Sequence, residues 1–131
     1  MSQKNVRLAR QAFDAFNRRD WAAFLALMDA DVEAVPRQAA MEGSFRGHDE
    51  VRRWLETLLD AIPDFTLDVL AVRDVADLTL ARLRNRGHGG ESDTPVEQTI
   101  WAVAQWRRGK CVWWRNFLDE AEALAAVGLS V

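Results

Sequence analysis

The stretch at residues 110–122 constrains the fold of this chain more than any other. It is a run of strand-forming residues with two adjacent tryptophans, followed by the acidic start of a helix. Side chains on a strand alternate between its two faces, so Trp114 and Asn116 share one face and Trp113 lies on the other. A strand with a tryptophan on each face is covered on both faces, and the rest of the chain must supply both covers.

The composition fits one globular domain spanning residues 1–131, with 49% hydrophobic and 28% charged residues. A net charge of -3 and a pI near 5.4 argue against nucleic acid or an anionic membrane as a partner, because both require a concentrated basic field. Cys111 is the only cysteine, so no internal disulfide forms, and the two histidines lack zinc-site spacing. We expect no metal or cofactor. The absence of an apolar signal segment favours a cytoplasmic location.

Helices are expected in the first half of the chain. Apolar residues recur at helical spacing over residues 6–16, and Asp20 can cap a short second helix. A third helix is expected from about His48 to a stop at Pro63, since acidic residues at its start favour the helix dipole.

Strands dominate the second half and indicate an α+β fold with an antiparallel meander. A short strand is expected at residues 31–36, where Pro36 restricts it to an edge or an end. Short polar or glycine-bearing turns then separate four further strands, and such turns join antiparallel neighbours. A closing helix begins at Asp119, and Gly128 is placed to end it. The four strands are residues 65–73, 78–86, 96–106 and 111–118.

Several motifs carry a family resemblance, at residues 12–20, 31–33, 45–47, 63–65 and 109–119. With this order of elements, the chain resembles the nuclear transport factor two-like superfamily, and within it the SnoaL-like branch that includes polyketide cyclases. It is similar in layout to ketosteroid isomerase and limonene-epoxide hydrolase. The resemblance implies a cystatin-like α+β roll, in which a curved antiparallel sheet and N-terminal helices enclose a conical pocket. The superfamily holds enzymes and non-enzymes, so the fold alone does not assign a reaction.

The resemblance also indicates where catalytic groups would stand. The isomerase positions fall on residues that can neither abstract a proton nor stabilise an oxyanion, so that mechanism has no first step here. The hydrolase positions fall on Leu83, Asn85 and Asn116, where amides replace carboxylates and cannot deprotonate a water. The isomerase positions are Ala12, Val35 or Pro36, Leu55 and Ala102.

Strand alternation gives the expected pocket a mostly apolar lining with a few amides, which is typical of a site for a neutral hydrophobic molecule. The chain would then bind such a ligand, either as a weak isomerase, cyclase or hydrolase or without catalysis. The alternative is that these side chains simply fill a core. A one-residue slip of the first strand would also turn Glu33 toward the pocket. The candidate ligand-binding residues are Leu55, Leu83, Asn85, Gln98, Ala102, Trp114 and Asn116.

Neither histidine is a strong catalytic candidate. His48 lies in a sequence typical of a helix start. His88 falls in the glycine-rich stretch at residues 87–93, which is expected to form a hairpin loop that can reach a pocket mouth.

The opposite sheet face predicts a protein interface. Alternation places Trp101, Trp113, Arg115 and Phe117 together on that face, and an exposed aromatic patch of this kind is near the limit that a monomer tolerates. We expect a homodimer through this face. Two alternatives remain: a non-catalytic interaction module that uses this face, or coverage of the face by residues 121–131.

Overall fold

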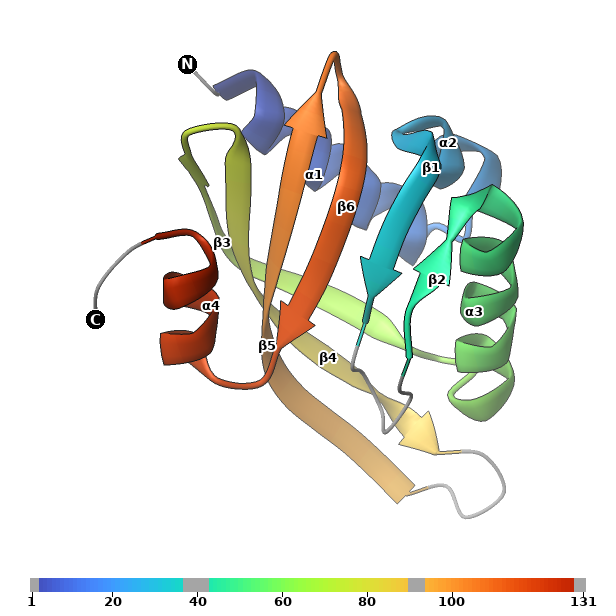
Figure 1. The fold of residues 1–131 in the computed structure, drawn as a ribbon. Helices are drawn as coiled ribbons and strands as arrows, with labels where there is room; N and C mark the ends of the chain where they lie inside the picture. Colours follow the sequence, from blue (N-terminus) through green and yellow to red (C-terminus); the bar gives the residue numbers. More distant parts are fainter. Residues whose placement is uncertain (1–2, 37–42, 90–93, 129–131) are drawn as a thin grey trace.

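The computed structural model describes residues 3–36, 43–89 and 94–128 (Figure 1). The helices are α1 (Gln3–Asn17), α2 (Trp21–Ala26), α3 (Gly47–Ala61) and α4 (Glu120–Ala126). The strands are β1 (Met28–Val35), β2 (Phe45–Arg46), β3 (Thr66–Val75), β4 (Leu78–Gly89), β5 (Thr94–Arg107) and β6 (Lys110–Phe117).

Within the described residues the strands form one curved sheet in the order β2-β1-β6-β5-β4-β3 (Figure 1). The last four strands are the antiparallel meander that the sequence predicts, and β1 joins the sheet by pairing parallel to β6. The α+β fold with a curved sheet is therefore confirmed, and the sheet is antiparallel apart from the β1–β6 pair. None of the helices in the described ranges is long and apolar enough to cross a membrane.

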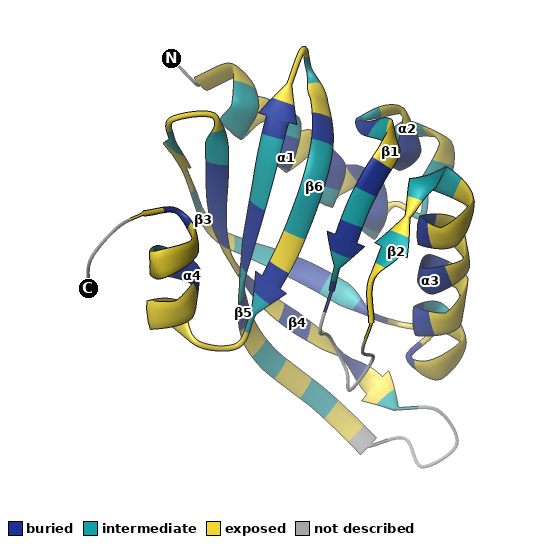
Figure 2. Ribbon diagram, viewed as in Figure 1, coloured by how far each residue is buried: buried dark blue, intermediate teal, exposed yellow. Residues whose placement is uncertain are grey.

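The two faces of the sheet are covered by different helices. On the inner face, α1, α2 and α3 pack over the main apolar cluster, which includes Phe16, Trp54 and Phe65. On the outer face, α4 packs Ala123 and Val127 against Leu80 and Val103. Figure 2 shows α3 and α4 exposed on their outward sides and buried toward the sheet. The two tryptophans of β6 thus meet two different covers, as strand alternation requires.

Acidic caps begin two helices where the sequence predicts them. Asp20 accepts a hydrogen bond from the Ala23 backbone at 3.1 Å, and Asp119 accepts one from the Ala121 backbone at 3.1 Å. Each carboxylate satisfies an amide that has no partner within its helix. Gly128 follows α4 with a φ of 79°, a conformation that glycine adopts without strain.

Two expected strand boundaries were wrong. β1 begins at Met28, because the backbone amide of Cys111 donates to Leu27 O at 2.8 Å and draws this segment into the sheet; Pro36 follows its end. β4 continues to Gly89, so His88 lies in a strand and pairs with Pro95 instead of lying in a loop. The expected loop residues 90–93 fall outside the described residues.

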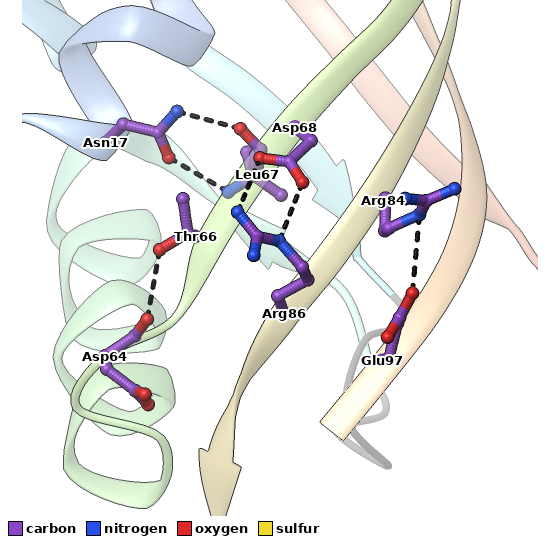
Figure 3. Close-up of polar contacts among 8 residues, drawn as sticks. All are labelled: Asn17, Asp64, Thr66, Leu67, Asp68, Arg84, Arg86 and Glu97. Atoms are coloured by element: carbon purple, nitrogen blue, oxygen red, sulfur yellow. Dashed lines mark hydrogen bonds and ion pairs between the residues drawn. The ribbon is translucent and has the colours of Figure 1, made fainter. Parts of the chain in front are cut away.

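Asn17 ties the end of α1 to the free edge of the sheet. Its Nδ2 donates to Leu67 O at 2.8 Å, and its Oδ1 accepts from Leu67 N at 2.9 Å (Figure 3). β3 is an edge strand, so these backbone groups have no strand partner on that side. The Asn17 amide replaces the missing strand and fixes α1 relative to β3.

The connection from α3 to β3 closes one end of the sheet over Gly87. A Cβ at Gly87 would lie 2.4 Å from Ile62 Cγ2, so only glycine leaves room for this packing.

Asp64 in the same connection accepts from His88 N at 2.7 Å, and its Oδ2 lies 2.7 Å from His88 Nδ1. This pairing holds the pKa of the Asp64 carboxyl below its ordinary value, mainly through the hydrogen bond from the His88 side chain. The ionised Asp64 carboxylate therefore stabilises the folded state at neutral pH. This stabilisation is lost as the pH falls through the lowered pKa.

Replacing Asn17 should destabilise the fold. We expect Asn17→Ala to lower the free energy of unfolding by about 1–3 kcal/mol, because two hydrogen bonds to the β3 edge are lost together. Arg18→Ala is the matched control, since its ion pair with Asp14 at 2.8 Å is exposed and should contribute less than about 1 kcal/mol. Urea unfolding curves measure both variants, and equal losses would contradict the role given to Asn17.

Replacing Gly87 should destabilise through overpacking. We expect Gly87→Ala to cost about 1–3 kcal/mol, because the new methyl group collides with Ile62. The same substitution in an Ile62→Ala background should cost less, since the colliding atom is gone. A thermal-unfolding double-mutant cycle tests this coupling, and strictly additive losses would show that the contact is not the cause.

Candidate functional site

A cavity of about 60 Å³ lies between α1 and the inner face of the sheet. Every helix except α4, and every strand except β2, contributes to its wall. The lining residues are Ala9, Ala12, Phe13, Phe16, Phe24, Met28, Trp54, Leu67, Thr79, Leu83, Ala102, Ala104, Trp106, Cys111, Trp114 and Asn116. These residues include no charged side chain.

Small residues on opposing elements line this cavity. Ala9 and Ala12 are on the buried face of α1, and Ala102 and Ala104 are on the inner face of β5. Alanine ends at Cβ, so at these positions neither α1 nor β5 extends a side chain into the space between them. The larger residues around them keep the helix and the sheet apart.

Aromatic rings form a rigid wall on one side of the cavity. The rings of Phe24 and Trp114 have centroids 6.1 Å apart and meet at 85°, while those of Trp54 and Trp114 are 5.7 Å apart at 58°. The first pair is edge-to-face and the second is tilted, and ring pairs at such distances contribute beyond the area they bury. Trp114 is therefore fixed by neighbours from two different helices.

Two polar groups are well placed to contact a bound molecule. Trp106 Nε1 donates to Thr79 Oγ1 at 2.9 Å, which leaves the Thr79 hydroxyl proton free to donate. Asn116 is only 3% exposed and lines the cavity. Among the described residues none hydrogen-bonds its side-chain amide, which offers both a donor and an acceptor.

Cys111 also lines the cavity, but its thiol is poorly suited to nucleophilic chemistry. Burial raises its pKa to about 12, so the thiolate is scarce at neutral pH. The Sγ donates to Trp113 O at 3.3 Å. Strand alternation alone would put Cys111 on the outer face. A register irregularity opposite Gln105 and Trp106 brings it inside.

Four of the seven candidate ligand-binding residues lie together in the cavity wall: Leu83, Ala102, Trp114 and Asn116. They come from three adjacent strands of the meander, and Ala102 pairs directly with Asn116. The strand alternation read from the sequence therefore groups these side chains on one face. Their role in binding stays a prediction.

The other three candidates lie outside the wall. Leu55 is fully buried on the inner face of α3, and Asn85 and Gln98 pair across β4 and β5. Asn85 is next to the cavity, because its other strand neighbour Leu67 lines it. Both polar atoms of the Asn85 side chain are buried without a hydrogen-bond partner among the described residues.

Neither Glu33 nor a histidine enters the cavity wall. Glu33 faces Arg46 at 3.4 Å and Arg115 at 3.9 Å, while its neighbours Val32 and Ala34 are in the inner core, so the first strand is not slipped. His48 lies in the first turn of α3 as expected, with its Nε2 3.0 Å from Met28 O.

Sequence reasoning missed several wall residues. Thr79 is not among the candidate residues, although strand alternation puts it on the same face as Leu83, and the small residues of α1 are not among them either. The pairing of alanines on α1 with alanines on β5 is the signal that would have located the cavity. The wall residues outside the candidate set include Ala9, Phe13, Met28, Trp54, Trp106 and Cys111.

Solved structures share this fold at low sequence identity. An NTF2-like protein of unknown function from Burkholderia pseudomallei aligns with a TM-score of 0.81 and 21% identity, covering 97% of this chain and 98% of that one. A protein assigned as a SnoaL-like polyketide cyclase from Jannaschia sp. aligns with a TM-score of 0.74 and 16% identity, covering 95% and 91%. A protein with a ketosteroid isomerase-like fold from Catenulispora acidiphila, solved with trimethylamine, gives 0.77 and 16%, covering 93% and 92%.

A search of curated protein sequences found no match. The comparison with protein families is more specific than the comparison with solved structures. The SnoaL-like domain family matches residues 9–114, which include fifteen of the sixteen cavity-lining residues. The chain therefore belongs to the SnoaL-like domain family and has the NTF2-like fold.

Proposed function

We propose that this protein binds a small, neutral, largely apolar molecule in the cavity between α1 and the sheet. The observation that carries the proposal is an apolar cavity whose wall includes the side-chain amide of Asn116, which has no hydrogen-bond partner in the part of the chain that the structure describes. Binding sites for small molecules combine an apolar wall with a few polar groups that orient the ligand. Asn116 and Thr79 are the orienting groups here.

The wall favours a neutral ligand because it contains no charged residue. An ion in such a site would lose its hydration without gaining a counter-charge, which costs far more than the cavity returns. A carbonyl, hydroxyl or carboxamide group on the ligand would satisfy the Asn116 amide. The remaining ligand surface would contact alanine, leucine and aromatic side chains.

The size of the cavity favours a small ligand. A volume of about 60 Å³ holds roughly four to six water-sized groups, since one buried water needs about 10–15 Å³. Sites for drug-sized ligands measure about 300–1,000 Å³. A compound with one ring therefore fits better than a polycyclic one, which would need wall residues such as the half-buried Phe13 and Trp114 to move.

The chemistry of the wall supports binding over catalysis. A general base must lie within hydrogen-bond reach of the proton that it removes. The described wall holds no carboxylate or imidazole, and the raised pKa of Cys111, to about 12, makes its thiolate scarce. The remaining catalytic option is to hold a flexible substrate in a reactive conformation, which needs no titrating group.

A size-graded ligand panel tests the proposal. We expect millimolar cyclopentanone, cyclohexanone and phenol to raise the melting temperature by a few degrees, since a tenfold excess over Kd stabilises by about 1.4 kcal/mol. A monoterpenoid alcohol and a steroid should give smaller shifts. Differential scanning fluorimetry, with chromatography of each mixture for product, makes the measurement. No shift with any compound would refute the proposal, and product formation would refute the preference for binding.

Two asparagine variants distinguish the bonding role of Asn116 from that of the buried Asn85, which lies outside the cavity wall. Asn116→Leu should reduce cyclohexanone affinity at least tenfold, because the ligand carbonyl then lacks its donor. Asn85→Leu should leave affinity within about twofold and should not lower the unfolding free energy, since removing an unpartnered buried amide is neutral or stabilising. Isothermal titration and urea unfolding measure the two effects. Equal loss of affinity in both variants would contradict the bonding role given to Asn116.

A further inference from the structure

The cavity wall presents two polar anchors on different strands. Thr79 is on β4 and Asn116 is on β6, and β5 lies between these strands in the sheet. Both residues line the cavity, and their exposed fractions are only 2% and 3%. A buried polar group that finds no partner is costly, so each anchor favours a ligand that satisfies it.

The indole of Trp106 holds the Thr79 hydroxyl ready to donate. Trp106 Nε1 donates to Thr79 Oγ1 at 2.9 Å, and Trp106 is itself buried. A hydroxyl has one proton and two lone pairs, so this contact uses a lone pair and leaves the proton available. No side chain or backbone group in the described ranges accepts that proton. Thr79 therefore needs an acceptor atom on the ligand, whereas the Asn116 amide can meet either a donor or an acceptor.

Strand register places the two anchors at opposite corners of a patch on the inner face of the sheet. Thr79 pairs with Ala104 on β5, and Asn116 pairs with Ala102, two residues away on the same strand. Neighbouring strands are about 4.8 Å apart and each residue advances about 3.3 Å, so about 12 Å separates the two Cα atoms. Between the corners, β5 presents only the methyl groups of the two alanines.

This separation fits a ring that carries polar groups on opposite carbons. Two hydrogen bonds of about 2.8 Å each span about half of the roughly 12 Å, which leaves about 6 Å between the two ligand atoms. Oxygens on opposite carbons of a six-membered ring have about this spacing, whereas oxygens on neighbouring carbons are much closer together. A single polar group cannot reach both anchors.

We propose that the cavity selects a one-ring molecule with polar groups on opposite ring carbons. This selectivity rests on the binding function proposed above. One ligand atom accepts from the Thr79 hydroxyl, and a carbonyl or hydroxyl at the other end bonds the Asn116 amide. The ring itself lies over Ala102 and Ala104. A ligand with one polar group satisfies one anchor and leaves the other buried without a partner.

Positional isomers of hydroxycyclohexanone test the spacing directly. The 2-, 3- and 4-hydroxy isomers contain the same atoms, so they differ mainly in the distance between the carbonyl and the hydroxyl. We expect the 4-isomer to bind about five- to tenfold more tightly than the 2-isomer or cyclohexanone, because one additional hydrogen bond forms. Isothermal titration calorimetry on the wild-type protein gives the dissociation constants.

Three threonine variants connect the preference to Thr79. Thr79→Val removes the hydroxyl but keeps a branched side chain, so the preference for the 4-isomer over the 2-isomer should disappear. Thr79→Ser restores a hydroxyl at the same position and should restore the preference. Thr99→Val is the matched control, because it makes the same change at an exposed position of β5 and should keep the preference. Circular dichroism shows whether each variant is folded.

The outcomes separate this selectivity from binding itself. Equal affinities for cyclohexanone and the three isomers would overturn the selectivity and leave the binding function standing. Tighter binding of the 2-isomer would also overturn it, as would a preference that survives Thr79→Val or is lost in Thr99→Val. Absence of binding by cyclohexanone and by every isomer would refute the binding function, and the selectivity with it. The wild-type comparison decides the spacing even if a variant fails to fold.

Discussion

The separation between α1 and the curved sheet is the constraint on which the rest of the structure depends. Facing alanines leave space between the two layers, and Asn17 fixes the helix by hydrogen bonds to the β3 edge. Phe24, Trp54 and Trp114 interlock beside that space and prevent its collapse. Interiors are normally packed as densely as organic crystals, so an open volume with this support is a property of the sequence.

Much of the fold can be predicted from local patterns in the sequence. Helical periodicity, the caps at Asp20 and Asp119 and alternation along β4, β5 and β6 predict most elements and the faces of the sheet. The cavity is harder to predict, because it depends on residues far apart in sequence that face each other only after folding. Cys111 shows the limit most clearly, since one irregularity in the β5–β6 pairing moves it to the other face.

The candidate site shows the same division between local and long-range information. Asn116 and Trp114 belong to the wall because side chains alternate regularly between the two faces over this part of β6. Asn85 pairs with the wall residue Leu67 but does not line the cavity itself. Alternation fixes the face that a residue occupies but not how far the cavity runs along that face. The burial of the aromatic residues on the outer face cannot be predicted without the position of α4. That position depends on packing after the last strand ends.

The central claim is that a neutral ligand occupies the cavity at Asn116. Side-chain amide signals in two-dimensional ¹⁵N–¹H NMR spectra report on each asparagine separately during a titration with cyclohexanone. The claim predicts that the Asn116 amide signals shift most and saturate with the ligand, while those of Asn5 on the first turns of α1 stay unchanged. Saturable shifts confined to outer-face residues such as the Trp101 indole, with Asn116 unmoved, would contradict it.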